Sequence, residues 1–274
     1  MERLHRKERV AAIFKVLSDK PNTVISLGYF SDVFGAARST LSEDITIVKK
    51  VVEMLGCGKI ETIPGAAGGV RYIAGMSNEK EKEFINSVCE KINDPSRVMP
   101  GGFLYINDLI YSPDIVNKIG VILANKFTSK NADYVVTVET KGIPIAMAVA
   151  SSLNIPLVIV RRNGEVTEGS TVSINYITGS SKRIQTMSLS KRSIKPKSKC
   201  IFIDDFIKAG GTAVGIIDLL KEFDCTVEGL GFLIESKPEG KKVLEDYIAL
   251  ISLEDIDGES GHIKITPSEK IIEK

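Results

Sequence analysis

Two adjacent carboxylates follow a short apolar run in the second half of the chain. Residues 200–203 predict a buried strand, Asp204 and Asp205 come next, and Gly210-Gly211-Thr212 opens a helix after a short loop. Carboxylates at a strand end can accept hydrogen bonds from ligand hydroxyls, whereas burying them without partners is costly. Amides at a helix start form an anion site, to which Lys208 adds positive charge. The stretch predicts a site for a ribose and a phosphate, and by spacing alone a helix cap with two solvated aspartates is the alternative.

A second short loop fits the same ligand. Residues 134–138 predict a buried strand, and Thr140-Lys141-Gly142 follow it before a helical pattern. Arg161 and Arg162 end a further strand at residues 157–160, and residues 161–199 carry nine Lys or Arg against two Asp or Glu. A basic segment beside such a pocket suits a polyanionic ligand or DNA. An ordinary strand–helix turn and a solvated basic ribbon are the alternatives for these two features.

The elements that must carry these loops alternate between strand and helix. The runs that predict strands and helices in turn are residues 134–138, 143–153, 157–160, 200–203, 212–223 and 227–234. Continuously apolar strands in such an alternation indicate a mostly parallel sheet with helices on both faces. Ligands bind at the carboxyl ends of the strands in sheets of this kind. The sequence therefore predicts an α/β domain over residues 75–274, with its site at that edge.

Residues 1–74 predict a winged helix–turn–helix. Helical patterns at residues 25–34 and 41–55 flank a turn, and the Gly-rich residues 64–69 join two alternating runs as in a hairpin. Thr40 and Glu43 form a capping-box pattern, which predicts the start of the last helix. Base and phosphate contacts concentrate in the first turn of a recognition helix, and amides of a wing approach phosphates. The DNA-contacting residues predicted in this way are Arg38, Ser39, Thr40, Ser42, Lys49, Gly68, Gly69 and Arg71. A three-helix dimerisation domain is the alternative.

The composition excludes several classes of protein. The chain has 274 residues, 43% hydrophobic and 26% charged, which excludes disordered and collagen-like proteins. A net charge of +1 excludes a wholly basic tail protein. The four cysteines form no CxxC pair and there are two histidines, so neither a metal site nor a disulfide framework is expected. With no apolar stretch of about 18 residues and no signal peptide, we expect a cytoplasmic protein without a membrane partner.

Residues 201–212 resemble the motif by which type I phosphoribosyltransferases bind phosphoribosyl pyrophosphate (PRPP). That motif has four apolar residues, two acids and a Gly-Gly-Thr loop, and Ala209 stands where these enzymes commonly carry threonine. Nearly the whole chain resembles the purine operon repressors of Bacillus- and Staphylococcus-type Gram-positive bacteria. The segments that carry this second resemblance are residues 42–44, 63–70, 99–102, 140–144, 166–189 and 204–212.

The resemblance implies a homodimeric repressor of purine synthesis and salvage genes. It implies a winged helix joined to a phosphoribosyltransferase-like domain without catalytic duty, and double-stranded DNA as partner. PRPP, accompanied by Mg²⁺, acts as the inducer that weakens operator binding, and guanine nucleotides such as ppGpp compete for its pocket. Asp204 and Asp205 then hold ribose hydroxyls, residues 208–212 the 5′-phosphate and residues 140–142 the diphosphate. The effector-binding residues expected are Phe103, Thr140, Lys141, Gly142, Arg161, Asp204, Asp205, Phe206, Lys208, Ala209, Gly210, Gly211 and Thr212, with Phe103 and Phe206 as candidates to stack on a base.

Two other functions fit parts of the sequence. One is an active purine phosphoribosyltransferase with an added domain, and the other is a PRPP-binding scaffold for other proteins. Ala209 argues against the enzyme, as does the lack of an evident purine-binding carboxylate beyond the motif. Nucleotide formation from PRPP and a purine base would indicate the enzyme, and failure to bind DNA with intact nucleotide binding would indicate the scaffold.

Overall fold

The computed structural model describes residues 4–65, 68–162, 169–177, 184–236, 244 and 246–272. Contacts divide the chain into two compact units, Met1–Glu81 with Ser151–Asn154 and Lys82–Ala150 with Ile155–Lys274. The domain boundary predicted at residues 74–75 precedes helix α4 (Asn78–Ile92), whose start belongs to the first of these units.

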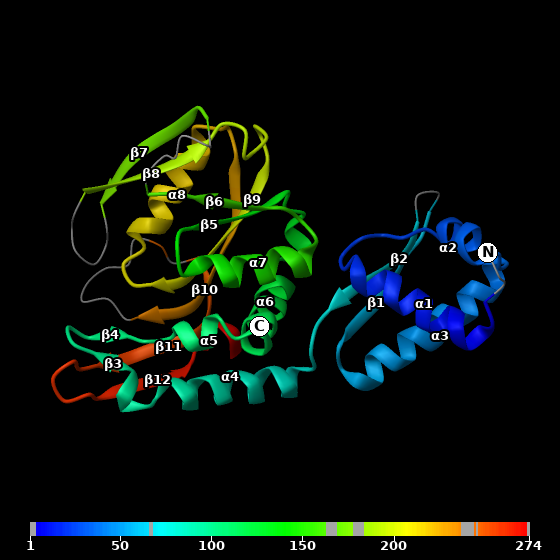
Figure 1. Cartoon of the computed structure of the whole chain (residues 1–274), viewed down its shortest axis with the longest axis horizontal. Helices are drawn as coiled ribbons and strands as arrows, with labels where there is room; N and C mark the ends of the chain where they lie inside the picture. Colours follow the sequence, from blue (N-terminus) through cyan, green and yellow to red (C-terminus); the bar gives the residue numbers. More distant parts are fainter. Residues whose placement is uncertain are drawn as a thin grey trace. The chain divides into compact units, whose positions relative to one another are not determined.

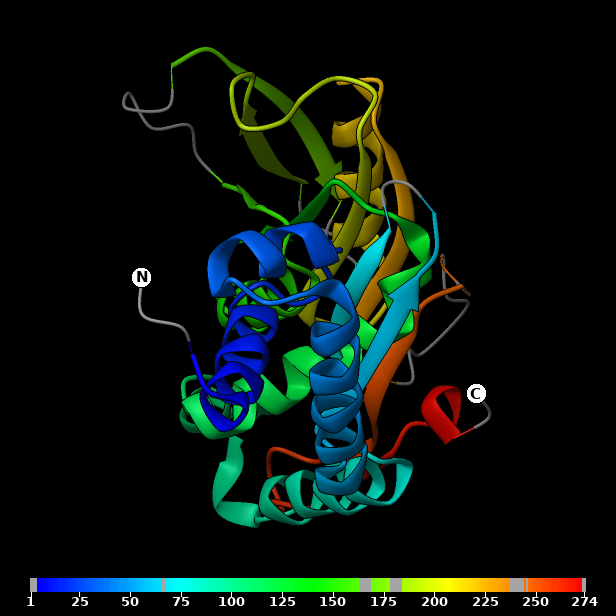
Figure 2. The ribbon, with the colours of Figure 1, turned by 90° about the vertical axis from the view of Figure 1, so that its right-hand side faces the viewer.

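The N-terminal unit is a helix–turn–helix followed by a hairpin. Helices α1 (Arg6–Asp19), α2 (Leu27–Phe34) and α3 (Arg38–Leu55) precede the antiparallel strands β1 (Gly58–Ile63) and β2 (Gly69–Ala74), drawn in cyan in Figure 2. Apolar positions of α3 at helical spacing form one side of the core with Phe30 and Ile60. The helices and hairpin predicted from the sequence are therefore present, and the hairpin supplies the wing.

Helix α3 begins earlier than the sequence predicts. Its N-cap is Ala37, which makes no side-chain cap, so the predicted capping box at Thr40 is wrong. The turn before it decides the start: Gly35 adopts the left-handed conformation, and the Ser31 hydroxyl donates to the Ala36 carbonyl at 2.9 Å. With the turn held in this way, the chain enters the helix directly after Ala37.

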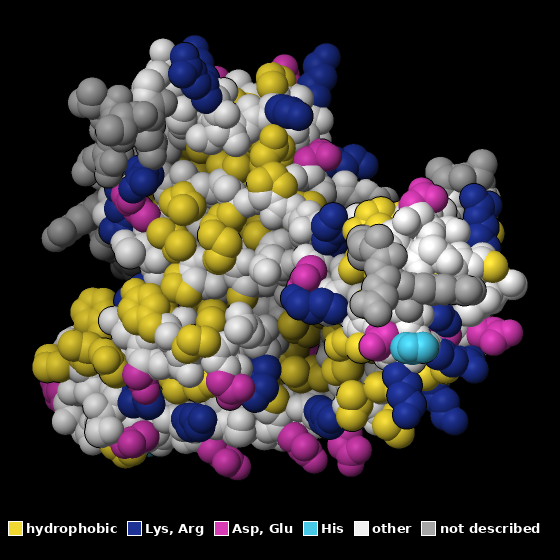
Figure 3. Space-filling model, turned by 45° about the vertical axis from the view of Figure 1, so that its right-hand side comes forward, with side chains coloured by type: hydrophobic (Ala, Val, Ile, Leu, Met, Phe, Trp, Pro, Cys, Tyr) yellow, Lys and Arg dark blue, Asp and Glu magenta, His cyan; other side chains and the backbone are white. Residues whose placement is uncertain are grey.

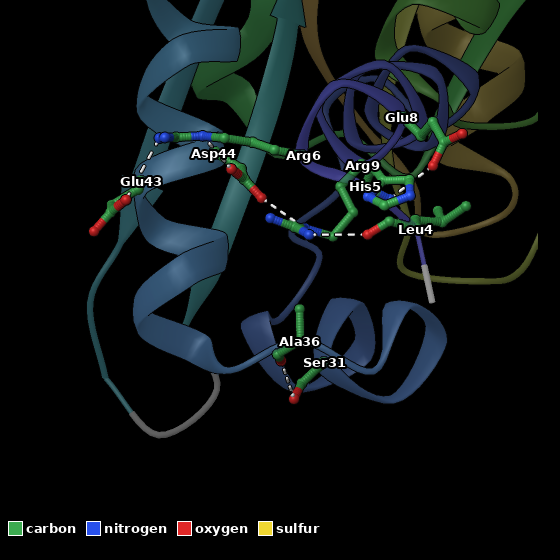
Figure 4. A network of polar contacts seen from close by, with 9 residues as sticks. All are labelled: Leu4, His5, Arg6, Glu8, Arg9, Ser31, Ala36, Glu43 and Asp44. Carbon is green, nitrogen blue, oxygen red and sulfur yellow. Dashed lines mark hydrogen bonds and ion pairs between the residues drawn. The ribbon is translucent and has the colours of Figure 1, made fainter. Parts of the chain in front are cut away.

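A buried ion pair joins α1 to α3. The Asp44 side chain is fully buried, with Arg9 Nε 2.8 Å and Arg6 Nε 3.2 Å from its carboxylate oxygens. Arg9 also donates to the Leu4 carbonyl at 3.0 Å, as Figure 4 shows. Asp44 therefore points into the unit, whereas its neighbours Ser42 and Glu43 on the same helix are exposed.

The C-terminal unit is built on a six-stranded sheet in the order β12–β11–β10–β9–β5–β6. Neighbouring strands are parallel except β12, which pairs antiparallel with β11. This confirms the predicted α/β fold with a mostly parallel sheet. The strands are β5 (Tyr134–Val138), β6 (Leu157–Val160), β9 (Lys199–Ile207), β10 (Thr226–Ser236), β11 (Ile248–Ile256) and β12 (Ile263–Pro267).

Helices and a ribbon cover the two faces of this sheet. On one face, α8 (Gly211–Lys221) and the antiparallel β7–β8 ribbon, made of β7 (Thr171–Ile177) and β8 (Ile184–Ser190), share a core with Phe202 and Phe232. On the other, Phe127 at the end of α6 packs on Gly229 and Gly231, where a Cβ would lie 2.5 and 2.9 Å from its ring. Figure 1 shows α7 (Gly142–Leu153) beside α6 (Pro113–Phe127) and α8 beside the ribbon.

Short elements complete the C-terminal unit. They are the 3-10 turns Pro95–Arg97 and Thr128–Lys130, β3 (Val98–Met99), β4 (Phe103–Leu104), α5 (Asn107–Ile110) and α9 (Glu269–Ile272). Helix α4 buries Ile85, Val88, Cys89 and Ile92. Within the described ranges, none of the helices combines the length and the apolar character that crossing a bilayer requires.

Candidate functional site

A cavity of about 650 Å³ lies at the carboxyl edge of the sheet. The last residues of β9, β10 and β11 line it, together with Lys141 after β5 and Arg162 after β6. The cavity therefore lies where ligands bind in proteins with parallel sheets, at the carboxyl ends of the strands. Nine of the predicted effector residues line it: Phe103, Lys141, Asp204, Asp205, Phe206, Lys208, Gly210, Gly211 and Thr212. The other four predicted residues, Thr140, Gly142, Arg161 and Ala209, are outside this lining.

The acidic pair stands inside β9 rather than after it. The sequence predicts that the strand stops at Ile203, but β9 continues to Ile207 because β10 is longer and pairs with it up to Glu235. Asp204 is buried, with 7% of its surface exposed, and accepts a hydrogen bond from the Asp205 amide at 2.9 Å. Both carboxylates line the cavity, where a hydroxyl-bearing ligand can donate hydrogen bonds to them.

Burial raises the pKa of both carboxyl groups. For Asp204, burial is the largest cause and the neighbouring Asp205 carboxylate adds to it, while Arg162 acts in the opposite direction. For Asp205, burial again raises the pKa, and its hydrogen bond with Asp204 and the charge of Lys141 lower it. Strongly perturbed carboxyl groups in a cleft are typical of a functional site.

The loop after β9 presents backbone amides to the cavity. Gly210 is the N-cap of α8 and has a positive φ of 87°, which favours glycine. The first amides of a helix have no acceptor within it, and the helix dipole places partial positive charge at them. Lys208 is exposed beside them. This loop can therefore bind a phosphate group through amides and one cation.

The loop after β5 is held against the acidic pair. A Cβ on Gly142 would lie 2.4 Å from Asp204 Oδ1 and 2.5 Å from Thr137 Oγ1, so only glycine fits. The Thr137 hydroxyl is buried and has no hydrogen-bond partner among the described residues. Gly142 thus lets the backbone of this loop lie close to Asp204 and Thr137. Lys141 is the side chain of this loop that lines the cavity.

Glu139 contacts both of the arginines that follow β6. Its carboxylate accepts the Arg162 amide at 2.6 Å and lies 3.5 Å from Arg161 Nη1. Arg161 was the residue predicted for the site, yet Arg162 lines the cavity. Successive side chains of an extended chain point to opposite sides, so only one of the two can face the ligand.

An apolar wall completes the cavity on the side of β3 and β4. Phe103 lines it with 69% of its surface exposed, next to the turn of Gly101 and Gly102. Met99 and Tyr105 are also exposed, and hydrophobic side chains gather at the lower left of Figure 3, over this part of the C-terminal unit. The exposed ring of Phe103 is available to stack on a base.

Sequence reasoning missed part of the lining. Tyr176 and Gln185 come from the β7–β8 ribbon, and Ser236 and Leu253 come from β10 and β11. These residues stand in ordinary strand patterns, which carry no local signal of a ligand. Arg162 and the glycines at 101–102 had a signal, a basic strand end and a Gly-Gly pair. Residues 163–168 and 178–183 of the predicted basic segment, and Ala66 and Ala67 of the wing, lie outside the described residues.

The predicted DNA-contacting residues fall into two groups. Arg38, Ser39, Ser42 and Lys49 are exposed on α3, and Thr40 is half-buried. The spacing of Arg38, Ser42 and Lys49 places them in one stripe of the helix. This stripe is exposed and carries basic and polar side chains of the kind that contact phosphates and base edges.

The wing residues are engaged within the hairpin. Arg71 lies 2.7 Å from Glu61, which also pairs with Lys59 at 2.7 Å, and these cations lower the pKa of Glu61. A Cβ on Gly68 would lie 2.2 Å from the Ile63 carbonyl, and one on Gly69 equally close to that of Ile25. Both glycines are therefore required by the packing of the hairpin, independently of any ligand.

Two family models match the chain. Residues 5–74 match the N-terminal family of the bacterial purine repressor, and residues 107–265 match the phosphoribosyl transferase domain. The purine biosynthesis transcriptional repressor PurR of Bacillus subtilis (strain 168) is 44% identical over 263 residues, which cover 96% of this chain and 92% of that protein. The chain belongs to the PurR family of purine biosynthesis transcriptional regulators. The resemblance found in the sequence is confirmed.

The PurR family contains both transcriptional repressors and transcriptional activators. The PurR of Lactococcus lactis subsp. lactis (strain IL1403), a purine biosynthesis transcriptional activator, is 38% identical over 93% of this chain and 94% of that protein. Among solved structures, an adenine phosphoribosyltransferase from Thermoanaerobacter pseudethanolicus is similar with a TM-score of 0.52 and 21% identity, covering 61% of this chain and 99% of that one. That likeness shows the fold alone. Membership of the PurR family therefore assigns this transferase fold to a transcriptional regulator.

Proposed function

We propose that the chain is a cytoplasmic, homodimeric repressor of purine biosynthesis and salvage genes, with PRPP as the inducer that weakens its binding to operator DNA. The observation that carries the proposal is one cavity lined by two carboxylates, an amide-rich helix start and three cations, in a chain that also bears a helix–turn–helix. Repression is favoured over activation because the relative named as a repressor is 44% identical and the relative named as an activator 38%.

The cavity matches the three chemical parts of PRPP. Asp204 and Asp205 accept hydrogen bonds from the ribose hydroxyls, and the amides of residues 208–212 hold the 5′-phosphate. Lys141 and Arg162 face the diphosphate, with Arg162 taking the role first given to Arg161. A guanine nucleotide such as ppGpp competes for the same phosphate loops and stacks its base on Phe103.

Mg²⁺ enters this site with PRPP. Asp204 and Asp205 offer the oxygen ligands that Mg²⁺ prefers, and the ion is commonly bound by one or two carboxylates plus ligand phosphates. The part of the chain that the structure describes contains no cluster of three or more metal-binding side chains. The remaining ligands of the ion therefore come from the diphosphate and from water.

Induction requires a difference in affinity. PRPP lowers operator binding only if it binds the DNA-free protein more tightly than the DNA-bound protein, and DNA then weakens PRPP binding by the same factor. A reorientation of the N-terminal unit and direct competition between PRPP and DNA for basic residues both satisfy this requirement.

A gel shift tests the proposed function. The purified full-length chain is titrated onto double-stranded DNA from upstream of a purine biosynthesis gene, with and without PRPP. We expect sequence-specific binding that PRPP weakens. Operator affinity that stays constant over a wide PRPP range contradicts induction, and nucleotide formation from PRPP and a purine base in the same sample would establish the transferase alternative.

Arg38→Ala is expected to weaken operator binding through the loss of one phosphate contact. Arg38 is the first residue of α3, is exposed, and has no ion pair with a described residue. The slope of log affinity against log salt concentration should fall by about one unit in magnitude. Lys20→Ala, which removes an exposed cation after α1, is the matched control and should leave the slope unchanged. An unaltered slope for Arg38→Ala would remove Arg38 from the interface.

A further inference from the structure

Two polar side chains of the β7–β8 ribbon face the effector cavity. Tyr176 and Gln185 stand directly opposite each other in the ribbon, and both line the cavity. The Tyr176 hydroxyl donates to Gln185 Oε1 at 2.9 Å, and 8% of the tyrosine surface is exposed. The hydrogen-bonded pair is therefore an ordered part of the cavity wall, although neither residue belongs to the loops that follow the parallel strands.

The ribbon places this pair next to the start of α8. Tyr176 and Met187 pack on Gly215, where a Cβ would lie 3.0 Å from Tyr176 Cβ and 2.8 Å from Met187 Cε. Gly215 stands about one helical turn after Gly211, which opens the helix. Since glycine at 215 lets the ribbon approach this closely, Tyr176 is fixed beside the amide-rich loop that binds anions.

The hydrogen bond within the pair determines what it offers a ligand. Because Gln185 Oε1 accepts the tyrosine hydroxyl, the Nε2 group of Gln185 keeps its two N–H donors. Anions require donors, and donors to charged groups give the stronger hydrogen bonds. Ala209 in the loop below has no side-chain donor. A hydrogen-bond donor from the ribbon therefore adds to the backbone amides of the loop in binding an anion.

We propose that Gln185 binds the phosphate held by residues 208–212 through Nε2, and that Tyr176 positions it. The inference rests on the proposed function, because it assigns a donor for the 5′-phosphate of the same effector. It makes the β7–β8 ribbon part of the phosphate site. The chemical class recognised is a ribose bearing a 5′-phosphate.

The test is calorimetric binding of ribose 5-phosphate and of PRPP to the full-length chain. Gln185→Glu keeps the shape but sets a carboxylate against the phosphate, and we expect about 10- to 100-fold weaker binding. Gln185→Leu removes the donors without adding charge and should weaken binding about 10-fold. Tyr176→Phe keeps the packing on Gly215 and should cause a smaller loss, since it only frees the Gln185 side chain.

Controls and the comparison of ligands make the test decisive. Thr186→Val changes the exposed neighbour of Gln185, which points to the other side of the ribbon, and should leave both affinities unchanged. Gln185 variants should weaken the binding of ribose 5-phosphate and of PRPP by the same factor, because both compounds carry the 5′-phosphate. A loss confined to PRPP, or affinities within about twofold of wild type for both glutamine variants, would overturn the inference while the proposed function stands. A wild-type chain that binds neither compound contradicts both.

Discussion

Asp204→Ala is expected to abolish the response of operator binding to PRPP and to leave operator binding without effector unchanged. Asp204 lies in the cavity wall of the C-terminal unit, whereas α3, which carries the proposed DNA contacts, belongs to the N-terminal unit. Each hydrogen bond to a charged group contributes about 1.5–3 kcal/mol, so loss of the contacts to two ribose hydroxyls raises the PRPP concentration for half-release by at least about 100-fold. Gel shifts over a PRPP titration measure this directly.

Two further variants sharpen this test. Asp204→Asn keeps the shape and removes the negative charge, so it should retain part of the response. Asp218→Ala removes an exposed carboxylate from α8, where Asp218 pairs with Lys221 on the surface, and should behave as wild type. Because the buried Asp204 carboxylate has a raised pKa, its replacement should not destabilise the fold. A normal PRPP response in Asp204→Ala would show that the acidic pair does not hold the ribose.

Asp44→Ala is expected to lower the free energy of unfolding of the N-terminal unit by about 3–5 kcal/mol, because it leaves the Arg9 guanidinium buried without its partner. Arg9 is 9% exposed and Asp44 is completely buried. The loss should appear as an early transition in urea unfolding of the full-length chain, followed by circular dichroism. Operator affinity should fall with it, because α3 carries the residues that we propose to contact DNA.

The neighbouring Glu43 provides the control for Asp44. Its side chain is 69% exposed and lies 3.4 Å from Arg6, so Glu43→Ala should change stability by at most about 1 kcal/mol. The double variant Arg9→Met with Asp44→Leu removes both charges and should recover most of the stability lost in Asp44→Ala. Equal stability of Asp44→Ala and Glu43→Ala would mean that the pair does not hold α1 against α3.

Local chemistry explains why much of the site could be predicted. Asp204, Asp205 and the glycines that follow are contiguous, so their residue types alone indicate a sugar and phosphate site, and the apolar run before them places it at a strand end. Lys141 was found for the same reason, as part of a short loop between a strand and a helix. The exact end of β9 was not predictable, because pairing with the longer β10 extends it.

Contacts between distant segments explain what the sequence left open. Arg161 and Arg162 are adjacent and chemically identical, and the contacts of Glu139 with both decide which one reaches the cavity. Tyr176 and Gln185 join the site only because Gly215 admits the ribbon against α8. Asp44 is buried because Arg9 of α1 donates a hydrogen bond to its carboxylate, and helical spacing within α3 does not reveal this contact.

By itself, the sequence determined the two kinds of domain, the edge of the sheet where the cavity lies and the contiguous residues of the proposed sugar-phosphate site. These properties follow from periodicity and residue type within short segments, where backbone geometry leaves few alternatives. The tertiary structure decided which of two neighbouring side chains faces the cavity, which carboxylate is buried in an ion pair and which ribbon residues complete the wall. Those outcomes depend on register and close packing between segments far apart in the chain, and no local pattern encodes them.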